Sequence, residues 1–177
     1  MADSKISDLT GLNAITSADL YTIVQSGVNY KATQTVVRES LGGVYRSRST
    51  VSSASLLTLG TVPVTIVAAP GANKYLNILT VCVSYNYGTV AYDFSSLESP
   101  TFQVGAGNAI RQIPYTIING GADFNANIGP FNTIFAGAAY LSTNTALTLT
   151  TSAGTNPTTG DGDLDVVVLY TIEDVNL

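Results

Sequence analysis

The sequence lacks histidine and tryptophan, has a single cysteine, and contains few charged residues. The absence of histidine excludes Ser-His-Asp and Cys-His catalytic arrangements and most zinc sites, because these depend on an imidazole. With Cys82 alone, no intrachain disulfide can form. Because Cys82 lies between Val81 and Val83 in an apolar run, we expect a buried, unreactive thiol. The few carboxylates are scattered among turn-like segments, so we expect a protein that is not an enzyme and has no cofactor.

Charge is scarce and unevenly divided along the chain. Only 11% of the residues are charged, against about 25% in a typical globular protein. In residues 1–48, five basic groups accompany four acids, a net charge of +1, whereas residues 49–177 carry two basic groups and eight acids, a net charge of −6. The acidic bulk argues against nucleic-acid binding, which needs a basic face. The overall deficit predicts that other subunits cover part of the surface.

Targeting and membrane segments are also missing from the sequence. No basic region followed by an apolar core stands at its beginning, so we expect no secretory signal. The longest apolar runs, such as residues 166–170, are far too short to span a bilayer. We therefore expect no membrane insertion.

From about residue 56 onward, the sequence is typical of short strands separated by turns. Leu147 and Leu149 alternate with Thr148 and Thr150, which is the period of a half-buried strand. Asn119-Gly120 follows an apolar run and predicts a type I′ hairpin turn. The pattern predicts a mainly β protein, an antiparallel β-sandwich of jelly-roll type. The expected strands cover 51–59, 62–68, 74–86, 89–94, 101–104, 110–118, 133–142, 145–151 and 164–173.

The last of these strands is apolar on both faces. Leu164, Val166 and Val168 fall on one face, while Val167 and Leu169 fall on the other. An antiparallel sheet with one wet face normally alternates apolar and polar residues. The pattern therefore predicts a deep sandwich core or a partner subunit, and the low charge favours the partner.

The first 43 residues form a region of different character. Two apolar runs separated by a polar turn at Gly27 predict a hairpin at residues 19–33, followed by a short helix that ends before Gly42-Gly43. This region has too few apolar residues to be stable without a partner. The next segment is polar and lacks any period. We therefore expect an N-terminal module at 1–43, a linker at 44–50 and a trimerising β-sandwich at 51–177.

Three aspartates precede the final strand and permit two interpretations. Asp161, Asp163 and Asp165 alternate along the chain, so three carboxylates on one side could hold a calcium ion. Asp and Gly are also the residues that a tight turn requires for backbone reasons. The turn is the preferred interpretation, and no metal is expected.

Three tyrosines surround one turn and also permit two interpretations. The first interpretation is that these side chains are exposed at the turn, stack on sugar rings and contact a glycan; they are Tyr85, Tyr87 and Tyr92. A tyrosine ring with its hydroxyl is equally suited to packing or to a wet subunit interface. Packing or subunit contact is preferred, and the three residues remain the candidate glycan contacts.

Segments 5–10 (KISDLT), 18–24 (ADLYTIV) and 30–33 (YKAT) resemble a short N-terminal module of tailed-bacteriophage virion proteins. Tyr21-Thr22 stands where that module usually has Leu-Pro. In such proteins the module attaches an appendage to the particle. The resemblance implies virion anchoring through Ile6, Leu9, Leu20, Tyr21, Ile23, Val24, Tyr30 and Lys31.

Segments 64–75 and 87–92, with the Gly-Asp-Gly-Asp sequence before the final strand, resemble phage head-fibre and capsid-decoration domains. The resemblance implies a homotrimeric β-sandwich carried on the virion, assembled in the host cytoplasm and bound to a capsid or other virion structural protein. It offers no catalytic residues to transfer. We therefore expect a head fibre or capsid-decorating protein. The alternative is a receptor-binding tail or neck fibre that contacts a host-surface glycan.

Overall fold

The computed structural model describes the backbone of residues 20–25 and 28–33, and residues 43–95, 98–105, 109–129 and 142–175. The chain divides into two compact units, Met1–Gly43 and Val44–Leu177. In the first unit, β1 (Leu20–Gln25) and β2 (Val28–Thr33) pair as an antiparallel hairpin, which confirms the hairpin expected at 19–33. The helix expected after it lies outside the described residues.

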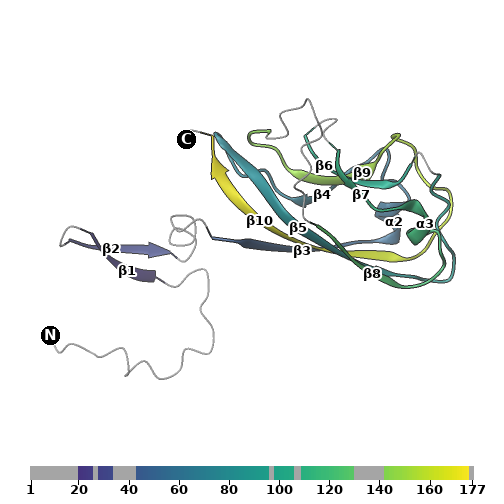
Figure 1. Ribbon diagram of the computed structural model, residues 1–177, viewed down its shortest axis with the longest axis horizontal. Coiled ribbons are helices and arrows are strands. Elements are labelled where there is room, and N and C mark those ends of the chain that lie inside the picture. The colour runs from purple at the N-terminus through teal and green to yellow at the C-terminus, as the bar shows by residue number, and fades with distance from the viewer. Residues whose placement is uncertain are drawn as a thin grey trace, which may run out of the picture. The chain divides into compact units, whose positions relative to one another are not determined.

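The second unit contains two four-stranded antiparallel sheets, arranged as the layers of a sandwich (Figure 1). One sheet has the order β3 (Tyr45–Val51), β10 (Asp163–Asp174), β5 (Lys74–Asn86) and β8 (Phe124–Ile128). The other has the order β4 (Val64–Val67), β9 (Leu147–Thr151), β6 (Pro100–Val104) and β7 (Ala109–Gln112). The expectation of a mainly β, antiparallel sandwich is confirmed.

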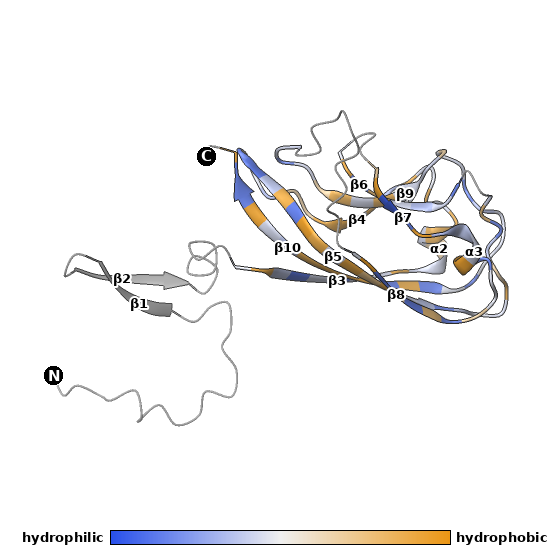
Figure 2. Cartoon of the chain, viewed as in Figure 1, coloured by the Kyte–Doolittle hydropathy of each residue, from blue (hydrophilic) through white to orange (hydrophobic). Residues whose placement is uncertain are grey.

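The core lies between the two sheets and is built by alternate residues of their long strands. Leu164, Val166 and Val168 of β10 are fully buried, as are Leu147 and Leu149 of β9. Figure 2 shows the hydrophobic segments along β5, β10 and β9 in orange. At about 1.5–3 kcal/mol for each fully buried aliphatic side chain, this layer is the main stabilising feature of the unit.

Two helical turns stand where the sequence predicted strands. The segment expected as a strand at 51–59 contains α2 (Ser53–Leu56), because the Ser52 hydroxyl caps the turn by accepting a hydrogen bond from the Ser55 amide. The segment expected at 110–118 ends its strand β7 at Gln112 and continues as α3 (Tyr115–Ile118). Both turns place apolar residues in the core, and strand-forming composition alone could not distinguish them from strands.

The type I′ hairpin expected at Asn119-Gly120 is also wrong. Asn119 ends α3 with a φ of −78°, and its side-chain Nδ2 donates to the Phe94 carbonyl at 2.7 Å. Residues 89–94, expected as a strand, form a loop, and β8 was not expected. Most of the strand expected at 133–142 lies outside the described residues.

The linker expected at 44–50 is the edge strand β3. Its inward residues are Tyr45, Ser47, Ser49 and Val51, and the hydroxyls of Ser47 and Ser49 donate to the Ile66 carbonyl of β4 at 3.1 and 3.5 Å. Its outward residues Arg46 and Arg48 are exposed. The alternation of serine and arginine lacks the apolar signal of a strand, so the polar composition was mistaken for a linker.

Candidate interaction surfaces

The hairpin β1–β2 presents two faces of different composition. Ile23 is paired with Tyr30, Tyr21 with Ala32 and Gln25 with Val28. Because successive strand positions alternate between faces, positions 21, 23, 25, 28, 30 and 32 share one face. The opposite face holds positions 20, 22, 24, 29, 31 and 33. The first face has the greater number of apolar and aromatic positions.

The residues expected to anchor the protein are therefore divided by the hairpin. Tyr21, Ile23 and Tyr30 occupy positions on one face, whereas Leu20, Val24 and Lys31 occupy positions on the other. Ile6 and Leu9 lie outside the described residues. A partner that covers one face of the hairpin would contact only three of the six expected residues that the structure describes.

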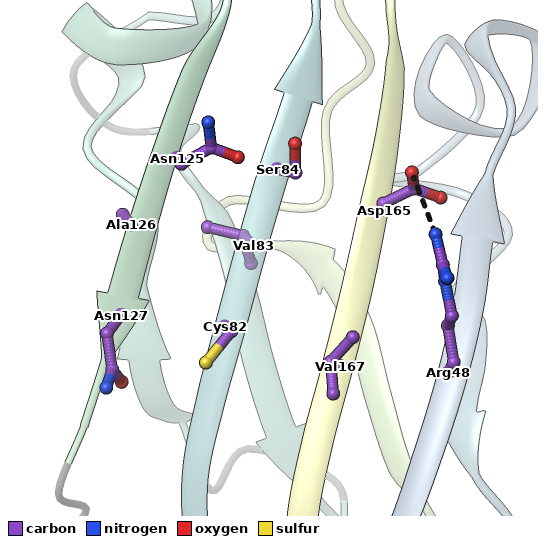
Figure 3. A pocket seen from close by; sticks show the side chains of 9 residues that line it. All are labelled: Arg48, Cys82, Val83, Ser84, Asn125, Ala126, Asn127, Asp165 and Val167. Carbon is purple, nitrogen blue, oxygen red and sulfur yellow. Dashed lines mark ion pairs between the residues drawn. The ribbon is translucent and has the colours of Figure 1, made fainter.

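A shallow hollow lies on the outer face of the β3-β10-β5-β8 sheet, which is the face turned away from the core (Figure 3). Outward residues of all four strands form this face. Strand pairing aligns them in three rows, namely Asn125, Ser84, Asp165 and Thr50; Asn127, Cys82, Val167 and Arg48; and Thr80, Leu169 and Arg46. We refer to these eleven residues as the outer face. The sequence analysis did not single out this surface, because β3 and β8, which supply five of its residues, were not predicted as strands.

The charged groups of the outer face lie toward β3. Arg48 and Asp165 form an ion pair with an N···O distance of 3.8 Å, and the Thr50 hydroxyl donates to Asp165 Oδ1 at 2.5 Å. The Arg48 side chain is 67% exposed and that of Asp165 is 24% exposed. At such exposure the pair contributes little to stability, so its guanidinium remains available to another group.

Cys82 is exposed on the outer face, contrary to the expectation of a buried thiol. Val81 and Val83 point into the core, and alternation along β5 turns the residue between them outward. The flanking valines therefore indicated the wrong face. Figure 3 shows the Cys82 sulfur beside Asn127 of β8.

The tyrosine cluster is a packing feature at two of its three positions. Tyr85 and Tyr92 are buried in the core, and the Tyr92 hydroxyl donates to the Gly162 carbonyl at 2.7 Å. Burial raises the pKa of Tyr85 to about 12 and also raises the pKa of Tyr92. Tyr87 is half-buried, and its hydroxyl donates to the Thr89 carbonyl at 2.8 Å. The glycan-contact prediction is wrong for Tyr85 and Tyr92, because neither ring reaches the surface.

The three aspartates before the final strand make contacts in three different parts of the second unit. Asp161 binds loop residues 89–90, Asp163 accepts from the Ser53 amide at 2.7 Å, and Asp165 pairs with Arg48. Among the residues that the structure describes, no group of three His, Cys, Asp or Glu side chains is arranged to hold a metal ion. The turn interpretation accounts for these contacts, because the three carboxylates bind backbone and side-chain donors of the protein itself.

Two exposed loops are fixed by carboxylates with lowered pKa values. Asp161 accepts from the Thr89 hydroxyl at 2.6 Å and from the Thr89 and Val90 amides at 2.8 Å, and these hydrogen bonds lower its pKa. The Thr158 hydroxyl, with the Thr158 and Thr159 amides, lowers the pKa of Asp93 in the same way. Each carboxylate joins loops that are far apart in the sequence.

We expect the second unit to lose stability as the pH falls below about 4. The folded-state pKa values lie below the unfolded value of about 3.9, so the stabilisation is present above that value and is lost as the pH falls through the lower folded values. Thermal unfolding between neutral and acidic pH measures the loss. The variant Asp161→Asn should unfold at a lower temperature at pH 7 and should approach the wild-type curve at low pH.

Asp174→Asn is the matched control for this measurement. Asp174 is exposed at the end of β10, and its carboxylate accepts no hydrogen bond from the described residues. Its unfolding temperature should follow the wild-type curve across the whole pH range. Parallel curves for Asp161→Asn and wild type would contradict the assignment.

In the part of the chain that the structure describes, no helix has the length and apolar character needed to cross a membrane.

Comparison with known proteins gives little that can be transferred. No protein-family model matches the chain, and no curated protein matches it. Among solved structures, the chain is similar to a chain of the Cyanophage Pam1 capsid asymmetric unit, with 23% sequence identity and a TM-score of 0.43. The match covers 73% of this chain and 85% of that chain. A likeness at this level carries no conclusion about function.

Proposed function

We propose that the protein is a non-enzymatic structural component of a tailed-phage virion. In this proposal it is a homotrimeric head fibre or capsid-decorating appendage, attached through its first unit. The observation that carries the proposal is the phage-type pattern of residues 5–33, whose two apolar segments pair as the hairpin β1–β2. The second unit is a sandwich with its own core, and it is the part that the anchor holds on the particle.

The hairpin suits a docking role because it needs a partner. A two-stranded hairpin is marginally stable in water, and an added strand or a covering surface supplies the missing stabilisation. The face with positions 21, 23, 28 and 30 is the more apolar one, so we assign it to the contact with a capsid or other virion protein. Burial contributes about 1.5–3 kcal/mol for each large aliphatic side chain, and three linked copies multiply the attachment.

Deleting residues 1–43 should leave a folded second unit that no longer joins particles. A finer test keeps the full chain and replaces Ile23 with aspartate. Loss of about 1.5–3 kcal/mol of burial corresponds to a tenfold or greater fall in affinity, so the copy number per particle should fall by at least about tenfold. Quantitative mass spectrometry of purified particles measures it.

Thr22→Asp is the matched control for the anchoring test. Position 22 lies in the same strand as position 23 but on the opposite face, so both variants lose similar strand preference. Thr22→Asp should leave the copy number near that of the wild type. Normal incorporation of the deletion variant, or equal loss in both aspartate variants, would overturn the proposed docking face.

The copy number in wild-type virions distinguishes the proposed head protein from the tail or neck alternative. Hundreds of copies would indicate a head protein, whereas a dozen or so would indicate a tail or neck component. The burial of Tyr85 and Tyr92 removes two of the three residues expected to bind a host glycan and leaves only the half-buried Tyr87 for the receptor-binding alternative.

A further inference from the structure

The outer face of the β3-β10-β5-β8 sheet is apolar at positions where a solvated sheet would be polar. On β10, Leu164, Val166 and Val168 fill the core, yet the outward residues Val167 and Leu169 are also apolar and only half-buried. An antiparallel sheet with one wet face alternates apolar and polar residues. The composition of β10 therefore suits contact with protein on both sides.

The β5–β8 side of the outer face carries no charge. Its outward side chains are short and neutral, namely Thr80, Cys82, Ser84, Asn125 and Asn127. Asp165 is the one acid among the outer-face residues, and Arg48 lies 3.8 Å from it. Depletion of charge toward the centre of a patch is characteristic of protein interfaces.

The negative net charge of the chain limits which surfaces of two copies can come into contact. Each chain has a net charge of −5, so two copies repel each other unless they meet through surfaces with few acids. The other acids of the second unit belong to the loops at 93–98, 123 and 161 or to the ends of β10. Asp163 and Glu173 share the outward side of β10 but lie beyond the ends of the three rows, so contact through the outer face is centred away from them.

The two sides of the outer face are complementary in hydrogen bonding. On β3, the exposed Arg48 guanidinium offers donors only. On β8, Asn127 Oδ1 accepts from the Thr80 hydroxyl at 2.6 Å, and the Asn125 side chain makes no hydrogen bond with any described residue. The Asn125 carboxamide of one copy can therefore accept from Arg48 of another. A contact that joins two different sides of the same molecule closes into a ring when the rotation between copies divides a full turn, and otherwise extends as an open filament.

We propose that the outer face packs against a second copy of this chain, with the β3 side of one copy against the β8 side of the next. The inference rests on the homotrimer of the proposed function and assigns the surface that forms it. The outer face has no aromatic side chain on which a sugar ring could stack, so a saccharide is the poorer occupant.

Cys82 allows a direct test on the full-length wild-type protein. It is the single cysteine of the chain, so every maleimide label reports the outer face. In the assembled oligomer, labelling should be at least about tenfold slower than in a urea-unfolded sample, because a covered thiol reacts only after the subunits dissociate. Dilution below the dissociation constant should restore fast labelling of folded protein.

The variant Val167→Arg tests the same contact by placing a large charge at the middle of the face. A buried unpaired charge is strongly destabilising, so the dissociation constant of the oligomer should rise by at least about a hundredfold. Val62→Arg is the matched control, because Val62 is 61% exposed and lies outside the outer face. Native mass spectrometry and analytical ultracentrifugation should show a trimer for the control and monomer for Val167→Arg.

The outcomes separate this inference from the proposed function. A trimer in which Cys82 reacts at the unfolded rate and Val167→Arg stays trimeric overturns the assigned surface and leaves the homotrimer standing. A monomeric wild-type protein overturns both, as does a monomer that binds saccharide through this face. If Val167→Arg does not fold, the Cys82 labelling of the wild-type protein decides.

Discussion

Replacing Gly160 with alanine is expected to destabilise the second unit by about 3–5 kcal/mol, which combines backbone strain with overpacking. Gly160 has a φ of +131°, a conformation that side chains of L-residues rarely adopt, and a Cβ at this position would overlap ring carbons of Tyr92. That ring is buried, and its hydroxyl is bonded to the Gly162 carbonyl, so it cannot move aside without losing a contact. Urea-unfolding midpoints measure the loss.

Gly71→Ala separates the two causes of this loss. Gly71 also has a positive φ, of 106°, but a Cβ there would meet nothing within 4 Å. Only the backbone strain remains at this position, so we expect the second unit to lose about 1–2 kcal/mol of stability. Equal losses at the two glycines would contradict the close approach of the chain to Tyr92.

The second large effect is expected when β3 (Tyr45–Val51) is removed, and two truncated chains that differ by eight residues test it. One begins just before this strand, at the boundary between the units, and the other begins just after it. A chain that begins at Val44 should fold with a stability close to that of the full-length protein. A chain that begins at Ser52 loses the seven residues that pair with β10, among them the buried Val51. Burial of one such valine contributes about 1.5–3 kcal/mol.

Removal of β3 also exposes the side of β10 and leaves Asp165 without Arg48 and Thr50. Since a domain of this size is stable by only about 5–15 kcal/mol, the chain that begins at Ser52 should be largely unfolded. Circular dichroism and urea titration of the two truncated chains give the comparison. A cooperative, near-wild-type transition for the shorter chain would show that β3 is dispensable.

Arg48→Ala controls for the surface contacts of β3. Its ion pair with Asp165 is exposed, so its loss should cost at most about 1 kcal/mol. A loss as large as that of the truncation would assign the effect to charge rather than to strand pairing and burial.

The strands that could be predicted from the sequence are those that bury apolar side chains at alternate positions. β5 was expected at 74–86 and occupies Lys74–Asn86, and β10 was expected at 164–173 and occupies Asp163–Asp174. Both supply many fully buried residues to the core. In such strands the hydrophobic pattern and the backbone pairing point to the same structure.

The elements that could not be predicted are those in which tertiary contacts replace the local pattern. β3 reads as a polar linker because its inward serines bond to β4 across the sandwich edge. The apolar α3 (Tyr115–Ile118) reads as a strand, because a single helical turn is too short to show a helical period. β8 is polar on its outer face and was overlooked for that reason.

The interaction surfaces were predicted only in part, because a face depends on register. The sequence drew attention to the segment that forms β1–β2, but pairing divides its anchoring positions between two faces. The tyrosine cluster was judged by proximity along the chain, and burial of Tyr85 and Tyr92 depends on contacts with residues about 70 positions away, such as Gly162. The outer face joins four strands that are distant in the sequence, so no local motif marks it.

The short distance between the unit boundary and β3 has a mechanical consequence. Tyr45, the first residue of β3, follows that boundary by a single residue, and its ring stacks on Tyr170 with centroids 5.4 Å apart. Val44 alone stands between the unit boundary and the paired strand. A force applied at Val44 is therefore borne by β3 from its first residue onward, with the Tyr45–Tyr170 stack as the first contact to yield.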